Sequence, residues 1–241
     1  NGFKVTPKDL DRVITSKTKA IVINSPSNPS GIVYTREELK VLAEMVVERG
    51  IYIVSDEIYE KTIYDGVKHV SIGSLSSAIF DKTITVNGVS KAYSMTGWRL
   101  GYCAGPGEII NAVNALQSHS TSGATTFAQY GGLAALTGSQ DCVARMVEAF
   151  TERRAYLYDR LMAIDGITCV KPMGAFYMLP NVSGFGLGSV VFAERLLESC
   201  GVAVVPGAPF GVDGHVRLSY ACGMDTIKDG MDKFEGFVKS L

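Results

Sequence analysis

The chain has 241 residues, of which 46% are hydrophobic and 20% are charged. This composition is ordinary for a folded protein and excludes an intrinsically disordered chain. The formal net charge is −1, from 23 basic and 24 acidic residues. Such a balance argues against a nucleic-acid partner or an anionic membrane surface. The sequence contains no apolar run near the roughly 20 residues that cross a bilayer, so we expect no membrane partner.

The cysteines and histidines are few and widely scattered. An odd number of cysteines without paired spacing favours reduced thiols in the cytoplasm over a disulfide framework. The histidines also lack the spacing of metal ligands. We therefore predict a cytoplasmic protein with no metal site. The residues concerned are Cys103, Cys142, Cys169, Cys200 and Cys222, and His69, His119 and His215.

The first half of the chain alternates short apolar runs with amphipathic stretches, which is typical of a parallel α/β sheet. Strands are predicted at 19–24, 51–54 and 83–87, followed by a fourth at 100–104 that could run antiparallel. Thr35 and Glu38 form a capping box for a helix that should end at Gly50. Polar residues follow the strand ends, where open α/β sheets bind ligands.

The second half begins with a mainly helical stretch and then changes its rhythm. Residues 108–162 should be helical, with breaks at Gly123, Gly138 and Ser139. We place a domain boundary within the last of these helices and divide the chain into 1–145 and 146–241. We thus predict an α/β domain followed by a smaller α+β domain. The later elements expected are strands at 167–170, 175–179, 202–205 and 215–219, and helices at 189–200 and 226–240.

Lys91 directly follows a predicted strand, in the sequence Ser90-Lys91-Ala92-Tyr93. Most lysines are solvated surface residues, but the residues around this one are small or apolar. An apolar setting favours the neutral amine that a nucleophile requires. An aldehyde cofactor that acts on amines needs such a lysine, together with a carboxylate, ring-hydroxyl donors and a cation for its phosphate.

Asp56 follows the apolar run at 51–54, and Tyr59 lies three residues further on. A carboxylate at this point could pair with a pyridine nitrogen and keep it protonated. A helical turn would bring the tyrosine to the same side. The alternative is that Asp56 only caps the next helix, and an Asp-x-x-Tyr pattern alone is a weak signal.

Two arginines and one asparagine complete the candidate site. Arg99 lies eight residues after Lys91, between Trp98 and Leu100, and a guanidinium can bind phosphate through two parallel hydrogen bonds. Arg217 lies inside a predicted apolar strand, where it needs an anion: either a substrate carboxylate or a structural salt bridge. Asn28 belongs to a turn at 25–31, which turn formation alone could explain.

These segments, taken in order, resemble those of the class I and II aminotransferases, a family of fold-type I pyridoxal-phosphate enzymes. The resemblance covers nearly the whole chain and is strongest to the bacterial aspartate and aspartate/prephenate aminotransferases. It implies a three-layer large domain with a mainly parallel sheet, then a small domain. The matching segments are 25–31, 54–59, 85–102 (TVNGVSKAYSMTGWRLGY) and 204–221.

The resemblance also implies the cofactor and a role for each candidate residue. The cofactor would be pyridoxal 5′-phosphate, bound as a Schiff base to Lys91, which would also move the proton at the substrate Cα. Asp56 would pair with the pyridine nitrogen, and Tyr59 and Asn28 would contact the ring hydroxyl. The phosphate would bind Arg99 and would also contact Ser90. The substrate carboxylate would bind Arg217, and Asn28 would also contribute to substrate binding.

Two departures from the family pattern qualify these expectations. Many members carry serine three residues before the lysine, whereas this chain has Gly88. The family also has an N-terminal segment with a phosphate turn and a ring-stacking aromatic residue, which we do not find here. We therefore expect that the chain is a C-terminal portion, incomplete as an enzyme by itself. The turn sequence and the family resemblance also predict a cis peptide bond between Asn28 and Pro29.

The function predicted from these residues is transamination between an amino acid, with aspartate favoured, and a 2-oxo acid. The intact protein should be a homodimer with these small molecules as its partners. Three alternatives stay open: a lyase of the same superfamily, a non-catalytic module that binds the cofactor, and an inactive fragment. The lyase would share the lysine, the aspartate and the arginines.

Overall fold

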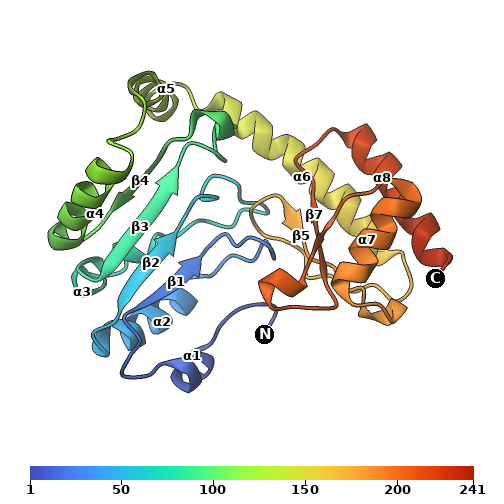
Figure 1. The fold of residues 1–241 in the computed structure, drawn as a ribbon, viewed down its shortest axis with the longest axis horizontal. Helices are drawn as coiled ribbons and strands as arrows, with labels where there is room; N and C mark the ends of the chain where they lie inside the picture. Colours follow the sequence, from blue (N-terminus) through green and yellow to red (C-terminus); the bar gives the residue numbers. More distant parts are fainter. The chain divides into compact units, whose positions relative to one another are not determined.

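The computed structural model describes residues 1–241, which form two compact units (Figure 1). The first unit consists of Asn1, Phe3–Pro26 and Val33–Arg145. The second unit consists of Gly2, Ser27–Ile32 and Met146–Leu241. The turn at Ser27–Ile32 therefore packs with residues that are more than a hundred positions later in the sequence.

The first unit is built on a four-stranded sheet in the order β1-β2-β3-β4. The strands are β1 (Ala20–Asn24), β2 (Tyr52–Asp56), β3 (Thr83–Gly88) and β4 (Gly101–Ala104). The first three run parallel, and β4 is antiparallel to β3, as the sequence suggested. The last residues of β1 and β2, Asn24 and Asp56, are opposite each other in the register. The carboxyl ends of the parallel strands thus share one edge.

The helix α2 (Arg36–Glu48) shows why these residues fold as they do. Thr35 and Glu38 form the predicted capping box, and Gly50 takes the left-handed conformation (φ 72°) that follows the helix end. Its buried residues recur at helical spacing, with Leu39 and Val46 almost fully enclosed. The other helical segments of this unit are α1 (Pro7–Val13), η1 (Ile72–Ser74), α3 (Ser77–Phe80), η2 (Thr96–Trp98), α4 (Gly107–Ser120) and α5 (Thr126–Thr137).

The helices α4 and α5 carry apolar side chains that the first unit does not bury. Leu116 on α4 is 73% exposed, and Tyr130 and Phe127 on α5 are 71% and 67% exposed. Side chains of this kind are normally covered by another surface. None of the helices in the chain is both long enough and apolar enough to span a membrane.

The second unit combines helices with a small antiparallel sheet. Its helix α6 (Asp141–Met162) begins at the end of the first unit, and α7 (Ser189–Cys200) and α8 (Met224–Lys239) follow. The sheet has the order β5-β7-β6, with β5 (Tyr177–Met178), β6 (Val205–Pro206) and β7 (Val216–Ser219). Short η segments lie at Ser183–Phe185 and Ala208–Phe210. The ring of Phe192 on α7 packs against Phe234 and Phe237 on α8.

Most of the predicted elements are present, but the strands of the second unit are shorter than expected. The strand predicted at 167–170 is wrong: Thr168 makes a single bridge, to Asn181. The left-handed Gly166 before it (φ 85°) and Pro172 after it, which has no N–H, leave little room for a longer ladder. The strand expected at 175–179 is reduced to β5 because Ala175 has a positive φ of 58°. The predicted cis bond between Asn28 and Pro29 is present.

Candidate functional site

The turn after β2 carries Asp56 and Tyr59. Asp56 is the last residue of the strand, and its Oδ1 accepts a hydrogen bond from the backbone N–H of Ile58 (3.2 Å). Its backbone carbonyl accepts hydrogen bonds from the Asn24 side chain and the Ser25 N–H, both at 3.2 Å. The Asp56 side chain stays partly exposed, whereas Tyr59 is only 3% exposed. The turn is thus tied to β1 while its carboxylate remains accessible.

The turn after β3 carries Ser90 and Lys91, which are both half-buried. The N–H of Tyr93 donates to the carbonyl of Val89, and the N–H of Ser94 donates to the carbonyl of Lys91, both at 3.3 Å. Because β2 and β3 are parallel neighbours, this turn leaves the sheet at the same edge as the turn that carries Asp56. An amine and a carboxylate therefore share one edge of the sheet.

Gly88, at the end of β3, explains one departure of this sequence from the family pattern. A Cβ atom at this position would lie 3.0 Å from the carbonyl oxygen of Leu100 and 3.1 Å from the Cα atom of Gly101. Both are backbone atoms of the antiparallel neighbour, so they cannot move aside as a flexible side chain could. A serine would not fit at position 88 without a shift of β4.

Arg99 stands at the end of η2 in a left-handed conformation (φ 51°), which is unusual for a residue with a side chain. Its side chain is exposed, and NH1 donates to the carbonyl of Thr96 (3.0 Å). A guanidinium has five N–H donors in a planar fork, so this single contact leaves donors available for an anion. The residue could therefore bind a phosphate group.

In the second unit, Arg217 and Asn28 are in direct contact. Arg217 lies on β7 and is half-buried, and its NH1 donates to the Asn28 side-chain oxygen (2.8 Å). Its guanidinium carbon lies 4.5 Å from the ring centre of Tyr177 and 5.3 Å from that of Phe210. The buried Nε atom has no hydrogen-bond partner. Within this unit the partner of Arg217 is a neutral amide, not the carboxylate of a structural salt bridge.

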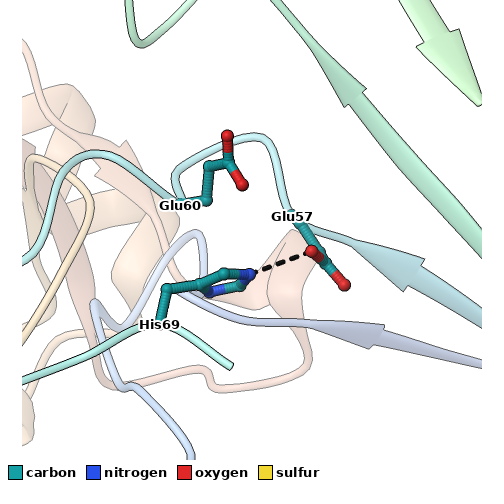
Figure 2. Close-up of side chains that lie close together, drawn as sticks. All are labelled: Glu57, Glu60 and His69. Atoms are coloured by element: carbon teal, nitrogen blue, oxygen red, sulfur yellow. Dashed lines mark hydrogen bonds and ion pairs between the residues drawn. The ribbon is translucent and has the colours of Figure 1, made fainter. Parts of the chain in front are cut away.

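The structure also shows a group that the sequence analysis did not single out: the Glu57 network, formed by Ser55, Glu57, His69 and Ser71. Both serine hydroxyls donate to Oε1 of Glu57 at 2.8 Å, and Oε2 lies 2.9 Å from Nε2 of His69. Figure 2 shows the contact between the imidazole and the carboxylate, with Glu60 beside them.

The electrostatics of Glu57 follow from this network. Burial raises the pKa of its carboxyl group, but the hydrogen bonds from His69, Ser55 and Ser71 outweigh burial, and the net pKa is lowered. Oxygen and nitrogen atoms of Glu57, Glu60 and His69 lie within 4.8 Å of one another. The spacing of the histidines did not reveal this cluster, because His69 meets a glutamate twelve residues earlier. The only sequence signal for this cluster was the spacing of Ser55 and Glu57, which are two residues apart and so lie on the same face of a strand.

Comparison with known proteins agrees with this geometry. A model of the family "Aminotransferase class I and II" matches residues 1–233. The aspartate aminotransferase of Geobacillus stearothermophilus is 50% identical over the whole chain, and a probable aspartate/prephenate aminotransferase of Aquifex aeolicus is 48% identical. The chain spans about 62% of the length of each of these two relatives.

Solved structures give the same result. An aromatic aminotransferase from Pyrococcus horikoshii OT3 superposes with a TM-score of 0.96 at 40% identity, covering 99% of this chain and 65% of that one. The Thermus thermophilus aspartate aminotransferase with maleate has a TM-score of 0.90 at 45% identity, covering 98% and 61%. The chain belongs to the class I and II aminotransferases, a family whose cofactor is pyridoxal 5′-phosphate.

Proposed function

We propose that this chain is part of a pyridoxal-phosphate-dependent aminotransferase that exchanges an amino group between an amino acid, aspartate in particular, and a 2-oxo acid. The observation that carries the proposal is the position of Asp56, the last residue of β2, and of Lys91, which follows the end of the neighbouring parallel strand β3. Support for aspartate comes from the 50% identity with an aspartate aminotransferase.

The chemistry of the donor set in the first unit fits the cofactor. It offers an amine at Lys91, a carboxylate at Asp56, a phenol at Tyr59 and an exposed guanidinium at Arg99. These are the groups that an aldehyde, a pyridine nitrogen, a ring hydroxyl and a phosphate require. When bound, the cofactor supplies an electron-withdrawing ring that stabilises negative charge at the substrate Cα.

The two residues at the sheet edge have distinct tasks. Lys91 would attach the cofactor covalently, and its amine would hold and move the proton of the substrate Cα. The carboxylate of Asp56 holds a proton on the pyridine nitrogen, because a negative charge there favours the protonated form. That proton keeps the ring electron-poor.

Three further residues of the chain orient the cofactor and its phosphate. Arg99 binds the phosphate through parallel hydrogen bonds, and Ser90 adds a hydroxyl donor. The hydroxyl of Tyr59 binds the ring hydroxyl of the cofactor. The left-handed backbone at Arg99 fixes the direction from which the guanidinium leaves the chain.

Arg217 binds the α-carboxylate of the substrate. Its Nε atom is buried without a hydrogen-bond partner, and a carboxylate that bridges Nε and a terminal nitrogen would satisfy it. The rings of Tyr177 and Phe210 restrict the guanidinium plane, so less side-chain entropy is lost on binding. The contact with Asn28 fixes one terminal nitrogen, NH1.

The intact protein acts as a homodimer in the cytoplasm. Support for a dimer comes from the exposed apolar side chains Leu116, Phe127 and Tyr130 on α4 and α5, which a second subunit could cover. Support for the cytoplasm comes from the five cysteines, all of which are free thiols.

Borohydride reduction tests the central assignment. The full-length protein that contains these residues is incubated with pyridoxal phosphate, reduced and mapped by mass spectrometry. The pyridoxyl group should be found on Lys91, and a Lys91→Ala variant should carry none. A pyridoxyl group on another lysine would remove the basis of the proposal.

Product analysis then separates transamination from lyase chemistry. With aspartate and 2-oxoglutarate, an aminotransferase forms glutamate and oxaloacetate in equal amounts. A lyase would consume aspartate without forming glutamate, and that result would contradict the proposed reaction.

A further inference from the structure

Glu57 is the one carboxylate of the chain that is fully buried, with 3% of the residue exposed. A buried carboxylate loses its hydration, which costs several kcal/mol per ion unless donors in the protein replace the water. Glu57 does not belong to the donor set proposed for the cofactor. Its position between Asp56 and Tyr59 therefore needs an explanation of its own.

Four contacts fix this residue. Its carboxylate is held by the side chains of Ser55, His69 and Ser71, and its backbone N–H donates to the carbonyl of Val86 on β3 (2.9 Å). The donors come from three different stretches of chain: β2 itself, residue 69 and the residue before η1. The carboxylate thus joins the turn after β2 to the segment around residues 69–71.

Because side chains alternate along a strand, the contacts that fix Glu57 also fix the direction of the Asp56 side chain. Successive side chains of a strand point to opposite faces of the sheet. When Ser55 and Glu57 lie on one face, the side chain of the residue between them lies on the other. The hydrogen bond between Ser55 and Glu57 fixes them on one side. Asp56 is then held on the other side, with its Oδ1 bound to the N–H of Ile58.

We propose that Glu57 is a positioning residue, whose hydrogen bonds to Ser55, His69 and Ser71 hold the turn that presents Asp56 and Tyr59 to the cofactor. This inference rests on the proposed function. Glu57 itself touches neither the cofactor nor the substrate, and it acts through the direction of its two neighbours.

Glu60 provides a matched control. It lies in the same cluster, as Figure 2 shows, but its side chain makes no hydrogen bond to Glu57 or His69. Its ionic contact is with the neighbouring Lys61, at 3.8 Å. A charge change at Glu60 therefore alters the local electrostatics without removing an anchor of the turn.

The test compares variants of the full-length protein that contains these residues, each titrated with pyridoxal phosphate. The variants are Glu57→Ala, Glu57→Gln, the milder Ser71→Ala, and the control Glu60→Gln. Val46→Ala, in the core of α2, serves as a control for lost stability alone. For each, the dissociation constant of the cofactor, the pH midpoint of its visible absorbance change, kcat, KM and the melting temperature are measured.

Glu57→Ala should raise the dissociation constant of the cofactor about 10- to 100-fold, the range expected for the loss of a charge-assisted contact. The pH midpoint of the absorbance change should rise, because a displaced Asp56 leaves the ring less protonated and less able to withdraw charge from the nitrogen bound to Lys91. The fall in turnover should be in kcat more than in KM. Ser71→Ala should raise the dissociation constant of the cofactor and the pH midpoint as well, but by smaller amounts than Glu57→Ala.

The rescue by glutamine separates positioning from plain stability. The glutamine amide can accept from both serines and donate to a neutral imidazole, so Glu57→Gln should bind the cofactor within about threefold of the wild-type constant. Glu60→Gln should match the wild type, and Val46→Ala should lower the melting temperature without moving the absorbance midpoint.

Two outcomes would overturn the inference while the proposed function stands: wild-type cofactor constants in Glu57→Ala and Ser71→Ala, or the same changes in Val46→Ala as in Glu57→Ala. A wild-type protein that takes up no cofactor would overturn the proposed function, and this inference with it.

Discussion

Two charged side chains, the buried Glu57 of the first unit and the half-buried Arg217 of the second unit, have very different hydrogen-bond partners. Glu57 in the first unit has two serine hydroxyls and an imidazole within 2.9 Å of its carboxylate. Arg217 in the second unit has one hydrogen bond to a neutral amide, two aromatic rings beside it, and a buried Nε atom without a partner.

The difference between these regions indicates what each charge does. A buried charge whose hydrogen-bonding capacity is filled by its own unit stabilises a local geometry and needs no further ligand. A charged group with a buried donor atom that has no partner costs stability in the free protein, and such groups are typical of binding sites. We therefore interpret Glu57 as part of the framework and Arg217 as a group that binds an anion.

The largest effect should come from Asp56, whose side chain faces away from that of its neighbour Glu57. Asp56→Ala in the full-length protein should leave the cofactor attached but reduce kcat on the order of 10³-fold, because the stabilisation of negative charge in the transition state is lost. Single-turnover absorbance measurements with aspartate check this. Near-normal turnover in Asp56→Ala would show that the carboxylates at 56 and 57 do not differ in function.

The second effect concerns Arg217. Arg217→Lys keeps the charge but loses the planar pair of donors, so kcat/KM for aspartate should fall about 10- to 100-fold. The matched control is Arg153→Lys, since Arg153 is also half-buried in the second unit, with its guanidinium carbon 5.7 Å from the ring centre of Phe150. Equal losses in both variants would mean that Arg217 has no special contact with the substrate.

Much of the first unit could be predicted from the sequence, because its signals are local. The apolar runs at 19–24, 51–54 and 83–87 correspond to β1, β2 and β3, and the capping box at Thr35 and Glu38 begins α2. Continuous apolar runs of this kind are typical of parallel strands and are easy to recognise. The turns with Asp56 and Lys91 follow directly from the strand ends.

The second unit and the contacts within both sites were harder to predict, because they depend on residues far apart in the sequence. Arg217 bonds to Asn28, 189 positions earlier, and His69 meets Glu57 across a loop. The short strands β5 and β6 are defined by their pairing with β7, not by their own periodicity. No spacing rule for metal ligands or hydrogen bonds covers such pairs.

A third and smaller effect should appear in the stability of the protein at acidic pH. The pKa of Glu57 is lowered in the folded state relative to its ordinary value of 4.5, so as the pH falls the unfolded chain takes up a proton first. Its stabilising contribution is therefore complete above that ordinary value and is lost as the pH falls through the folded pKa. Melting temperatures measured from pH 7 to pH 3 should fall less steeply for Glu57→Gln than for the wild type. Parallel curves would contradict the assigned network.

The smallest effect should come from Phe210, the more distant of the two rings beside Arg217. Phe210→Leu keeps an apolar side chain but removes the π face, which is worth about 0.5–1 kcal/mol at an exposed site. Since Phe210 is 37% exposed, KM for aspartate should rise only about two- to fivefold, with kcat nearly unchanged. Tyr177→Leu should cost more, because that ring is 8% exposed and its centre lies 4.5 Å from the guanidinium. If Phe210→Leu had the larger effect, the rings would not act by restricting Arg217, and direct contact of Phe210 with the substrate would be the better explanation.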